Sequence, residues 1–96
     1  MRSYEVLFII KPDLDEDAVN AVVEKFTNLI QETEGTVEEV SRWGKKRLAY
    51  EIKKFREGIY VLILFQGTPA TVRELDRVLR ISDEVLRHLI VRREAA

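Results

Sequence analysis

Residues 59–65, Ile59-Tyr60-Val61-Leu62-Ile63-Leu64-Phe65, form an unbroken apolar run rich in β-branched and aromatic side chains. Successive side chains of a strand point to opposite faces of a sheet, so this run predicts a strand with apolar residues on both faces. Residues 4–11, Tyr4-Glu5-Val6-Leu7-Phe8-Ile9-Ile10-Lys11, also carry apolar residues on both sides. We therefore expect both segments in the middle of one sheet.

The strand at residues 4–11 leads into a segment with the spacing of an amphipathic helix. Asp13 or Asp15 can cap the free amides at its start, and the helix is expected over about residues 15–34. Gly35 is expected to end it by adopting a positive φ. Its apolar stripe consists of Val19, Val22, Val23, Phe26, Leu29 and Ile30.

The strand at residues 59–65 leads into a second helix. Thr68 and Pro69 form a start signal, a capping residue followed by proline in the first turn, and the helix is expected to end near Ile81. Its apolar stripe consists of Val72, Leu75, Val78 and Leu79.

Two further extended segments complete the pattern. Residues 36–53 predict a long strand with a bulge or a bend at Gly44, where the alternation shifts, and residues 53–58 predict a polar turn. Residues 85–91 alternate again. The order strand, helix, strand, strand, helix, strand predicts an α+β, ferredoxin-like fold: one domain over residues 1–96, with both helices on one face of a four-stranded antiparallel sheet.

No helix is left to cover the second face of this sheet. A contiguous apolar patch of that size is rare on a monomer, so a protein partner is expected to cover it, although self-association or a loop folded over the sheet remain alternatives. The predicted partner-binding residues on this face are Leu7, Ile9, Tyr60, Leu62, Leu64, Leu89 and Val91.

The charge is segregated, although the net charge is only −1. Residues 13–39 hold nine acids against Lys25 alone, a local charge of −8. Residues 42–56 hold seven bases against Glu51 alone, a local charge of +6. One region is therefore suited to a polyanion that the other repels.

The residues that usually carry catalysis are absent. The chain has no cysteine, and its single histidine, His88, is expected on the same face of the strand as Leu86 and Ile90, as a structural residue. The four glycines are too scattered for a phosphate cradle, and the acidic residues near 13–17 lack the glycine and glutamate of a calcium loop. We expect no enzyme activity, cofactor, metal or small-molecule substrate.

The composition also bears on location. No apolar run approaches the roughly 20 residues that a membrane helix needs, and the chain enters a strand pattern at once, so neither a signal peptide nor a membrane anchor is expected. The absence of cysteine permits a reducing cytoplasm.

Residues 42–54 combine bases with two aromatic residues, Trp43 and Tyr50. Cationic groups pair with phosphates, and aromatic rings stack on exposed bases or pack against a protein, so the mixture suits RNA. A solvated basic hairpin anchored by Trp43 explains the same composition, and the residues alone leave both interpretations open.

Several blocks of the chain carry a resemblance to a known family. They are Met1-Arg2-Ser3-Tyr4-Glu5, Trp43-Gly44-Lys45-Lys46-Arg47-Leu48-Ala49-Tyr50, Gly58-Ile59-Tyr60 and Asp83-Glu84-Val85-Leu86-Arg87-His88-Leu89-Ile90-Val91-Arg92. In this order, and with Pro12, Ile52 and Lys53, the sequence resembles the family of the sixth protein of the bacterial small ribosomal subunit. The resemblance spans essentially the whole chain.

The resemblance implies a ferredoxin-like structural protein of the ribosome, in the cytoplasm. It implies binding to the central domain of 16S ribosomal RNA as a heterodimer with the eighteenth small-subunit protein. RNA contact is carried over to Arg2, Lys45, Lys46, Arg47, Arg80, Arg87 and Arg92. Within the most specific block, Trp43, Leu48 and Tyr50 are assigned to the partner.

Two rival functions share the strand and helix order. An RNA-recognition module would need aromatic residues where Ile59 and Val61 stand, and a base where Glu57 stands, so that alternative fails. A ferredoxin-like regulatory or dimerisation module that binds a small metabolite or a protein survives, because the fold alone does not exclude it. Its distinguishing feature would be a polar pocket.

Overall fold

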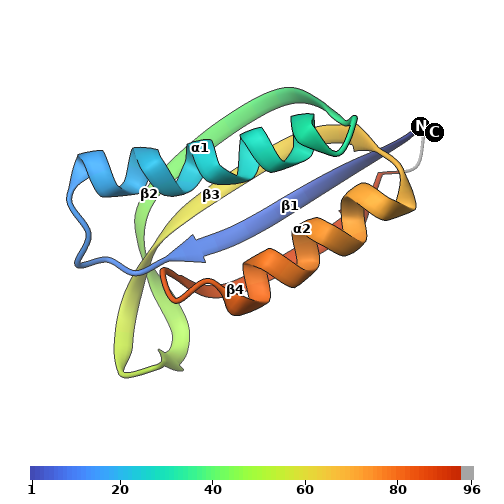
Figure 1. Ribbon diagram of the computed structural model, residues 1–96. Helices are drawn as coiled ribbons and strands as arrows, with labels where there is room; N and C mark the ends of the chain where they lie inside the picture. The colour runs from blue at the N-terminus through green and yellow to red at the C-terminus, as the bar shows by residue number, and fades with distance from the viewer. Residues whose placement is uncertain (94–96) are drawn as a thin grey trace.

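The computed structural model describes residues 1–93 and has the predicted order of elements (Figure 1). These are β1 (Arg2–Ile10), α1 (Glu16–Glu32), β2 (Thr36–Ile52), β3 (Phe55–Gly67), α2 (Pro69–Ile81) and β4 (Val85–Arg92). The sheet order is β2-β3-β1-β4, and every pair is antiparallel. The two runs apolar on both faces are the two central strands, β1 and β3, as predicted.

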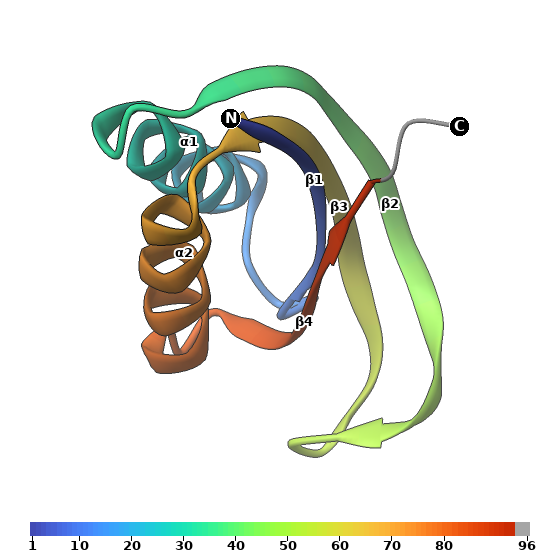
Figure 2. The same ribbon diagram turned by 90° about the vertical axis from the view of Figure 1, so that its right-hand side faces the viewer.

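Both helices lie on one face of the curved sheet, and within residues 1–93 no helix covers the other face (Figure 2). The main core lies between the helices and the sheet, and Phe8, Phe26 and Phe65 are fully buried in it. Phe8 of β1 meets Phe26 of α1 edge to face, with 5.3 Å between ring centroids. The inward apolar face of β1 thus packs against the apolar stripe of α1, as the sequence predicts.

The ends of α1 are set by Asp15 and by a left-handed residue. The Asp15 carboxylate accepts a hydrogen bond from the amide of Ala18 at 2.8 Å, as expected of a cap. The left-handed residue is Glu34, with φ 69°, so the prediction that Gly35 adopts a positive φ was wrong. Gly35 is required for space instead, because a Cβ there would lie 2.7 Å from the carbonyl oxygen of Gln66.

The start of α2 is capped as predicted, and it also ties the two helices together. The hydroxyl of Thr68 accepts a hydrogen bond from the amide of Thr71, and the hydroxyl of Thr71 accepts one from the amide of Thr68. The buried Thr71 hydroxyl also donates to the carbonyl of Thr33 at 3.0 Å, at the end of α1.

The hairpin between β2 and β3 is tighter than predicted. A polar turn over residues 53–58 was wrong, because β3 begins at Phe55 and the turn consists of Lys53 and Lys54 alone. Both lysines have positive φ, 48° and 71°, which is the geometry that matches the twist of paired strands. The usual Asn-Gly signal is absent, so the turn was not recognisable. The predicted bulge at Gly44 is confirmed.

Another irregularity lies at the start of β4. Ile9 pairs with Arg87 while Ile10 pairs with Val85, so Leu86 is an extra residue. The expectation that His88 shares a face with Leu86 was therefore wrong. Leu86 packs instead with Ile9 and Leu48 on the face away from the helices.

Candidate nucleic-acid and partner interface

The face of the sheet without helices, called the open face below, is apolar over much of its area. The register places on it Glu5, Leu7 and Ile9 of β1, Tyr60, Leu62 and Leu64 of β3, and Arg87, Leu89 and Val91 of β4. Leu89 is 59% exposed and Val91 40% exposed, whereas Leu7, Leu62 and Leu64 are partly covered by their neighbours. The seven partner-binding residues predicted for this face thus belong to one surface.

The β2–β3 hairpin continues past the ends of β1 and β4 and curls there (Figure 2). Between the pairs Arg47–Glu57 and Ile52–Phe55, β2 has four residues and β3 has one, so residues 48–51 leave the ladder. Leu48 from this segment packs with Ile9 and Leu86 into a second, smaller core.

Ile9 and Leu48 are therefore covered largely by the chain itself. They are only 8% and 9% exposed, which leaves little area for the partner to which the sequence assigned them. Their contact fixes the position of the hairpin on the sheet.

Tyr50 and Arg87, assigned by the sequence to different partners, contact each other. The Arg87 guanidinium donates a hydrogen bond to the Tyr50 hydroxyl and lies 5.8 Å from the centre of the ring. Both side chains remain exposed. This contact joins the hairpin to the open side of β4.

Trp43 stacks on Tyr60 at the border between the open face and the hairpin. The two ring planes are 7° apart and their centroids are separated by 6.3 Å, an offset stack. Trp43 is 46% exposed although it is in contact with Tyr60.

The outer part of the hairpin, residues 45–57, is called the basic arm below. Two acids, Glu51 and Glu57, reduce its charge to +4. Its exposed bases are Lys45, Lys46, Arg47, Lys53, Lys54 and Arg56. The sequence-based site included only the first three, and the charge count over residues 42–56 was the signal that pointed to the others.

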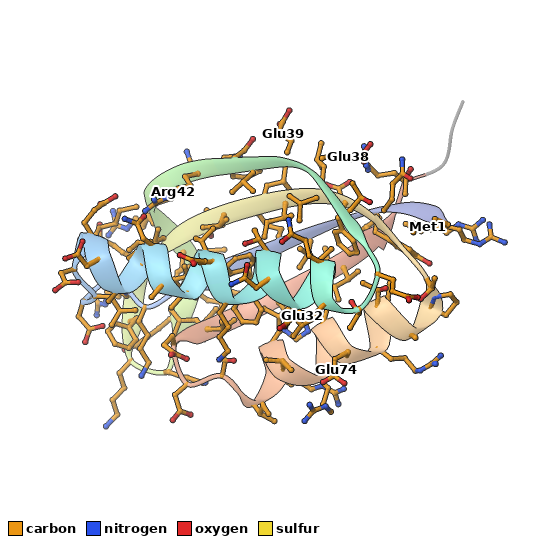
Figure 3. The ribbon with its side chains drawn as sticks, turned by 45° about the horizontal axis from the view of Figure 1, so that its top comes forward. Met1, Glu32, Glu38, Glu39, Arg42 and Glu74 are labelled. Atoms are coloured by element: carbon orange, nitrogen blue, oxygen red, sulfur yellow. The ribbon has the colours of Figure 1, made fainter. Side chains whose placement is uncertain are left out.

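Arg42, the first base of the predicted basic cluster, faces α1 and not the arm. Its guanidinium donates to the amide oxygen of Asn20 and to the carboxylate of Glu16, the latter at 3.3 Å. Figure 3 shows Arg42 on β2 above the amino-terminal end of α1. Arg42 was counted among the bases of residues 42–56 that could attract a polyanion, but it is paired with the acidic helix α1.

The other predicted RNA contacts are dispersed. Arg2 pairs with Gly67 and Lys45 pairs with Ile59. Gly67 and Ile59 are eight positions apart on β3, which is about 26 Å at roughly 3.3 Å per residue. Arg92 pairs with Tyr4, near the Arg2 end of the sheet.

Arg80 lies on α2, on the helix side of the molecule, with its guanidinium 2.6 Å from a carboxylate oxygen of Asp76. A single flat RNA surface does not contact Arg80 and the open-face Arg87 at once.

His88 is a satisfied structural residue, as predicted. Its Nε2 lies 2.7 Å from Oδ1 of Asp76, and since a carboxylate only accepts, the imidazole donates. This hydrogen bond holds the pKa of Asp76 below its ordinary value, with the positive charge of Arg80 adding to the effect. The interaction connects β4 to α2.

The 93 described residues contain no cluster of three or more histidine, cysteine or acidic side chains placed to hold a metal. Among those residues there is also no helix with the length and apolar character to cross a membrane.

Comparison with known proteins decides the family. The family model of ribosomal protein S6 matches residues 3–92. The chain belongs to the ribosomal protein S6 family. Small ribosomal subunit protein bS6 of Moorella thermoacetica is 61% identical to it over 94 residues, covering 98% of this chain and 96% of the relative. The bS6 protein of Desulforamulus reducens is 51% identical over 92 residues, covering 96% of this chain and 97% of the relative.

Solved structures agree with the S6 assignment. The crystal structure of 30S ribosomal protein S6 from Thermotoga maritima has a TM-score of 0.91 and 38% identity, covering 96% of this chain and 87% of that one. The C-terminal domain of MgtC from Mycobacterium tuberculosis, at 16% identity and a TM-score of 0.65, shares the fold alone.

Membership of the S6 family makes this a ribosomal protein of the small subunit, located on the ribosome in the cytoplasm, and not an enzyme. The prediction of a ribosomal structural protein is thereby confirmed, and the alternative of a metabolite-binding regulatory module is set aside.

Proposed function

We propose that this protein binds the central domain of 16S ribosomal RNA together with the eighteenth small-subunit protein. The open face contacts the protein partner, and the basic arm contacts the RNA. The observation that carries this proposal is the adjacency of an uncovered apolar sheet face and a cationic hairpin in one small domain.

The apolar half of the proposal rests on surface that the fold leaves exposed. Leu89 and Val91 lie on edge strand β4. Across β1, the register aligns Leu89 with Leu7 and Leu62, and Val91 with Glu5 and Leu64. Burial of water-exposed apolar surface by a partner contributes a favourable free energy of about 25 cal/mol per Å². A protein partner is therefore the occupant that stabilises this face most.

The cationic half rests on the geometry of the arm. Register places Lys46 opposite Gly58 and on the open-face side, while Lys45 and Arg47 alternate to the other side. A phosphate backbone that crosses the hairpin meets positive charge on both sides. With a net +4 the arm provides few phosphate contacts, so binding by this protein alone is expected to be weak and binding with the partner tight.

A filter-binding titration tests the proposal. The central-domain RNA is titrated with this protein in the presence and absence of the eighteenth small-subunit protein, at several salt concentrations. We expect weak, salt-sensitive binding alone and tight binding with the partner. Tight, salt-insensitive binding by the protein alone, or no binding even with the partner, contradicts the proposal.

A charge-reversal variant separates the two surfaces. Lys46→Glu with Arg47→Glu should weaken RNA binding and reduce the slope of log K against log salt by about 2, since each lost phosphate contact removes about one. Partner binding in a pull-down should change less. The matched control reverses Arg73 and Arg77 on the exposed face of α2. If the arm variant loses the partner more than the RNA, the arm belongs to the protein interface.

A further inference from the structure

Trp43 presents a large aromatic surface to solvent at a place where the strand is irregular. Arg42 pairs with Val61 and Gly44 pairs with Tyr60, so Trp43 is an extra residue on β2. A bulge of this kind redirects a side chain, and here it brings the indole parallel to the Tyr60 ring on the open face. The two rings together form a flat, rigid aromatic surface.

Gly44 keeps the space beside this surface clear. It has φ +80°, a conformation that glycine adopts without strain, and an added Cβ would meet no atom within 4 Å. A planar group can therefore approach the exposed side of Trp43 close to the backbone.

Positive charge begins immediately beside the rings. Lys46 lies two residues after Gly44 on the same face of β2, a separation of about 7 Å along the strand. The nearest acid on β2 is Glu39, opposite Leu64 and four β3 positions from Tyr60, and its carboxylate accepts a hydrogen bond from Ser41. The nearest acid on β3 is Glu57, three positions from Tyr60 and opposite Arg47, and it alternates to the other face of the strand. Arg42 is engaged with α1.

We propose that Trp43, supported by Tyr60, stacks on an unpaired base of RNA, with Lys46 on the adjoining phosphate. Aromatic faces beside cations are how proteins hold unpaired nucleotides. This inference rests on the proposed RNA binding and deepens it. It moves Trp43 from the partner surface, where the sequence analysis had assigned it, to the RNA surface. The apolar residues Leu62, Leu64 and Leu89 remain for the protein partner.

The fluorescence of Trp43 tests the stacking directly, because this is the only tryptophan in the chain. The intact protein is titrated with the central-domain RNA, with the eighteenth small-subunit protein, and with both. An eight-nucleotide oligoadenylate serves as a generic probe for stacking. We expect strong quenching by RNA, with or without the partner, and little change with the partner alone.

Variants separate a stacked base from an apolar contact. Trp43→Leu keeps apolar area but removes the π face, and it should weaken RNA binding by about 5- to 150-fold, the range for a lost base–aromatic stack. Trp43→Phe keeps a π face and should retain most of the RNA affinity. Partner binding should be nearly equal for both. Ile81→Ala, which trims a side chain 65% exposed on α2, is the surface control.

Each outcome decides the inference. RNA binding without quenching, with Trp43→Leu equal to the unchanged protein, overturns the inference and leaves the proposed function intact. A spectral change with the partner alone, and loss of partner binding in Trp43→Leu, assigns Trp43 to the protein interface and also overturns it. If the central-domain RNA does not bind at all, the proposed function fails and the oligoadenylate titration decides the stacking by itself.

Discussion

The substitution Gly58→Ala tests the idea that the basic arm is fixed to the sheet by the small core under it. Gly58 lies in β3 on the open-face side, where its missing side chain leaves room for Ile9. A Cβ at this position would lie 2.2 Å from Cγ2 of Ile9 and 3.5 Å from Cδ2 of Leu48.

The magnitude follows from these distances. An ordinary carbon–carbon contact needs about 3.5–4.0 Å, so Ile9 or the strand must move by more than about 1 Å. Cγ2 is the branch methyl of a stiff β-branched side chain, and Ile9 is only 8% exposed, so the methyl has little freedom to move aside. Overpacking of this kind costs about 1–3 kcal/mol.

The unfolded state reduces that cost. Replacing glycine by alanine lowers the entropy of the unfolded chain and contributes about 0.4–1 kcal/mol in the opposite direction. We therefore expect Gly58→Ala to lower the free energy of unfolding by about 1.5 kcal/mol and the Tm by about 6–12 °C. Urea and thermal unfolding followed by circular dichroism measure both quantities.

A double-mutant cycle identifies the cause. Ile9→Ala removes the clashing Cγ2, so Gly58→Ala should cost much less in the Ile9→Ala background than in the unchanged protein. Ile9→Val keeps both γ carbons, so the full cost should remain in that background. A neutral Gly58→Ala, or the same cost in both Ile9 backgrounds, would show that the Ile9 methyl is not the cause of the destabilisation.

Two further predictions concern pairs that the fold creates. Asp76→Asn should lower the stability at pH 7 by about 1 kcal/mol, because it weakens the charge-assisted hydrogen bond from His88. The Asp76 pKa is depressed in the folded state, so this stabilisation is present above about pH 4 and is lost as the pH falls through the folded pKa. The difference in the free energy of unfolding between the two proteins should therefore be smaller at pH 3 than at pH 7, and an equal difference at both pH values would contradict the assignment. Arg42→Gln should change the stability by less than about 1 kcal/mol, as expected for an exposed pair with Glu16, and should leave the salt dependence of RNA binding unchanged. A fall of about one in the slope of log K against log salt would mean that Arg42 leaves α1 to contact phosphate.

The order of the elements, the two central strands and the apolar faces of the helices can all be predicted from the amino-acid sequence. These properties follow from local periodicity: apolar runs on both faces mark β1 and β3, and stripes at helical spacing mark α1 and α2. It also contained the blocks that identify the S6 family, because a family signature is a property of residue identity in order.

Contacts between distant parts of the chain set which charged and aromatic side chains are available for binding. Arg42 and Glu16 are 26 residues apart, and Arg87 and Tyr50 are 37 apart, so neither pairing leaves a local signal. The bulges near Gly44 and at Leu86 change which face each following side chain meets, and one extra residue is enough because the period of a strand is two. The sequence thus indicates a basic, aromatic segment, but only the folded chain places Trp43 on Tyr60 and directs Arg42 away from the arm.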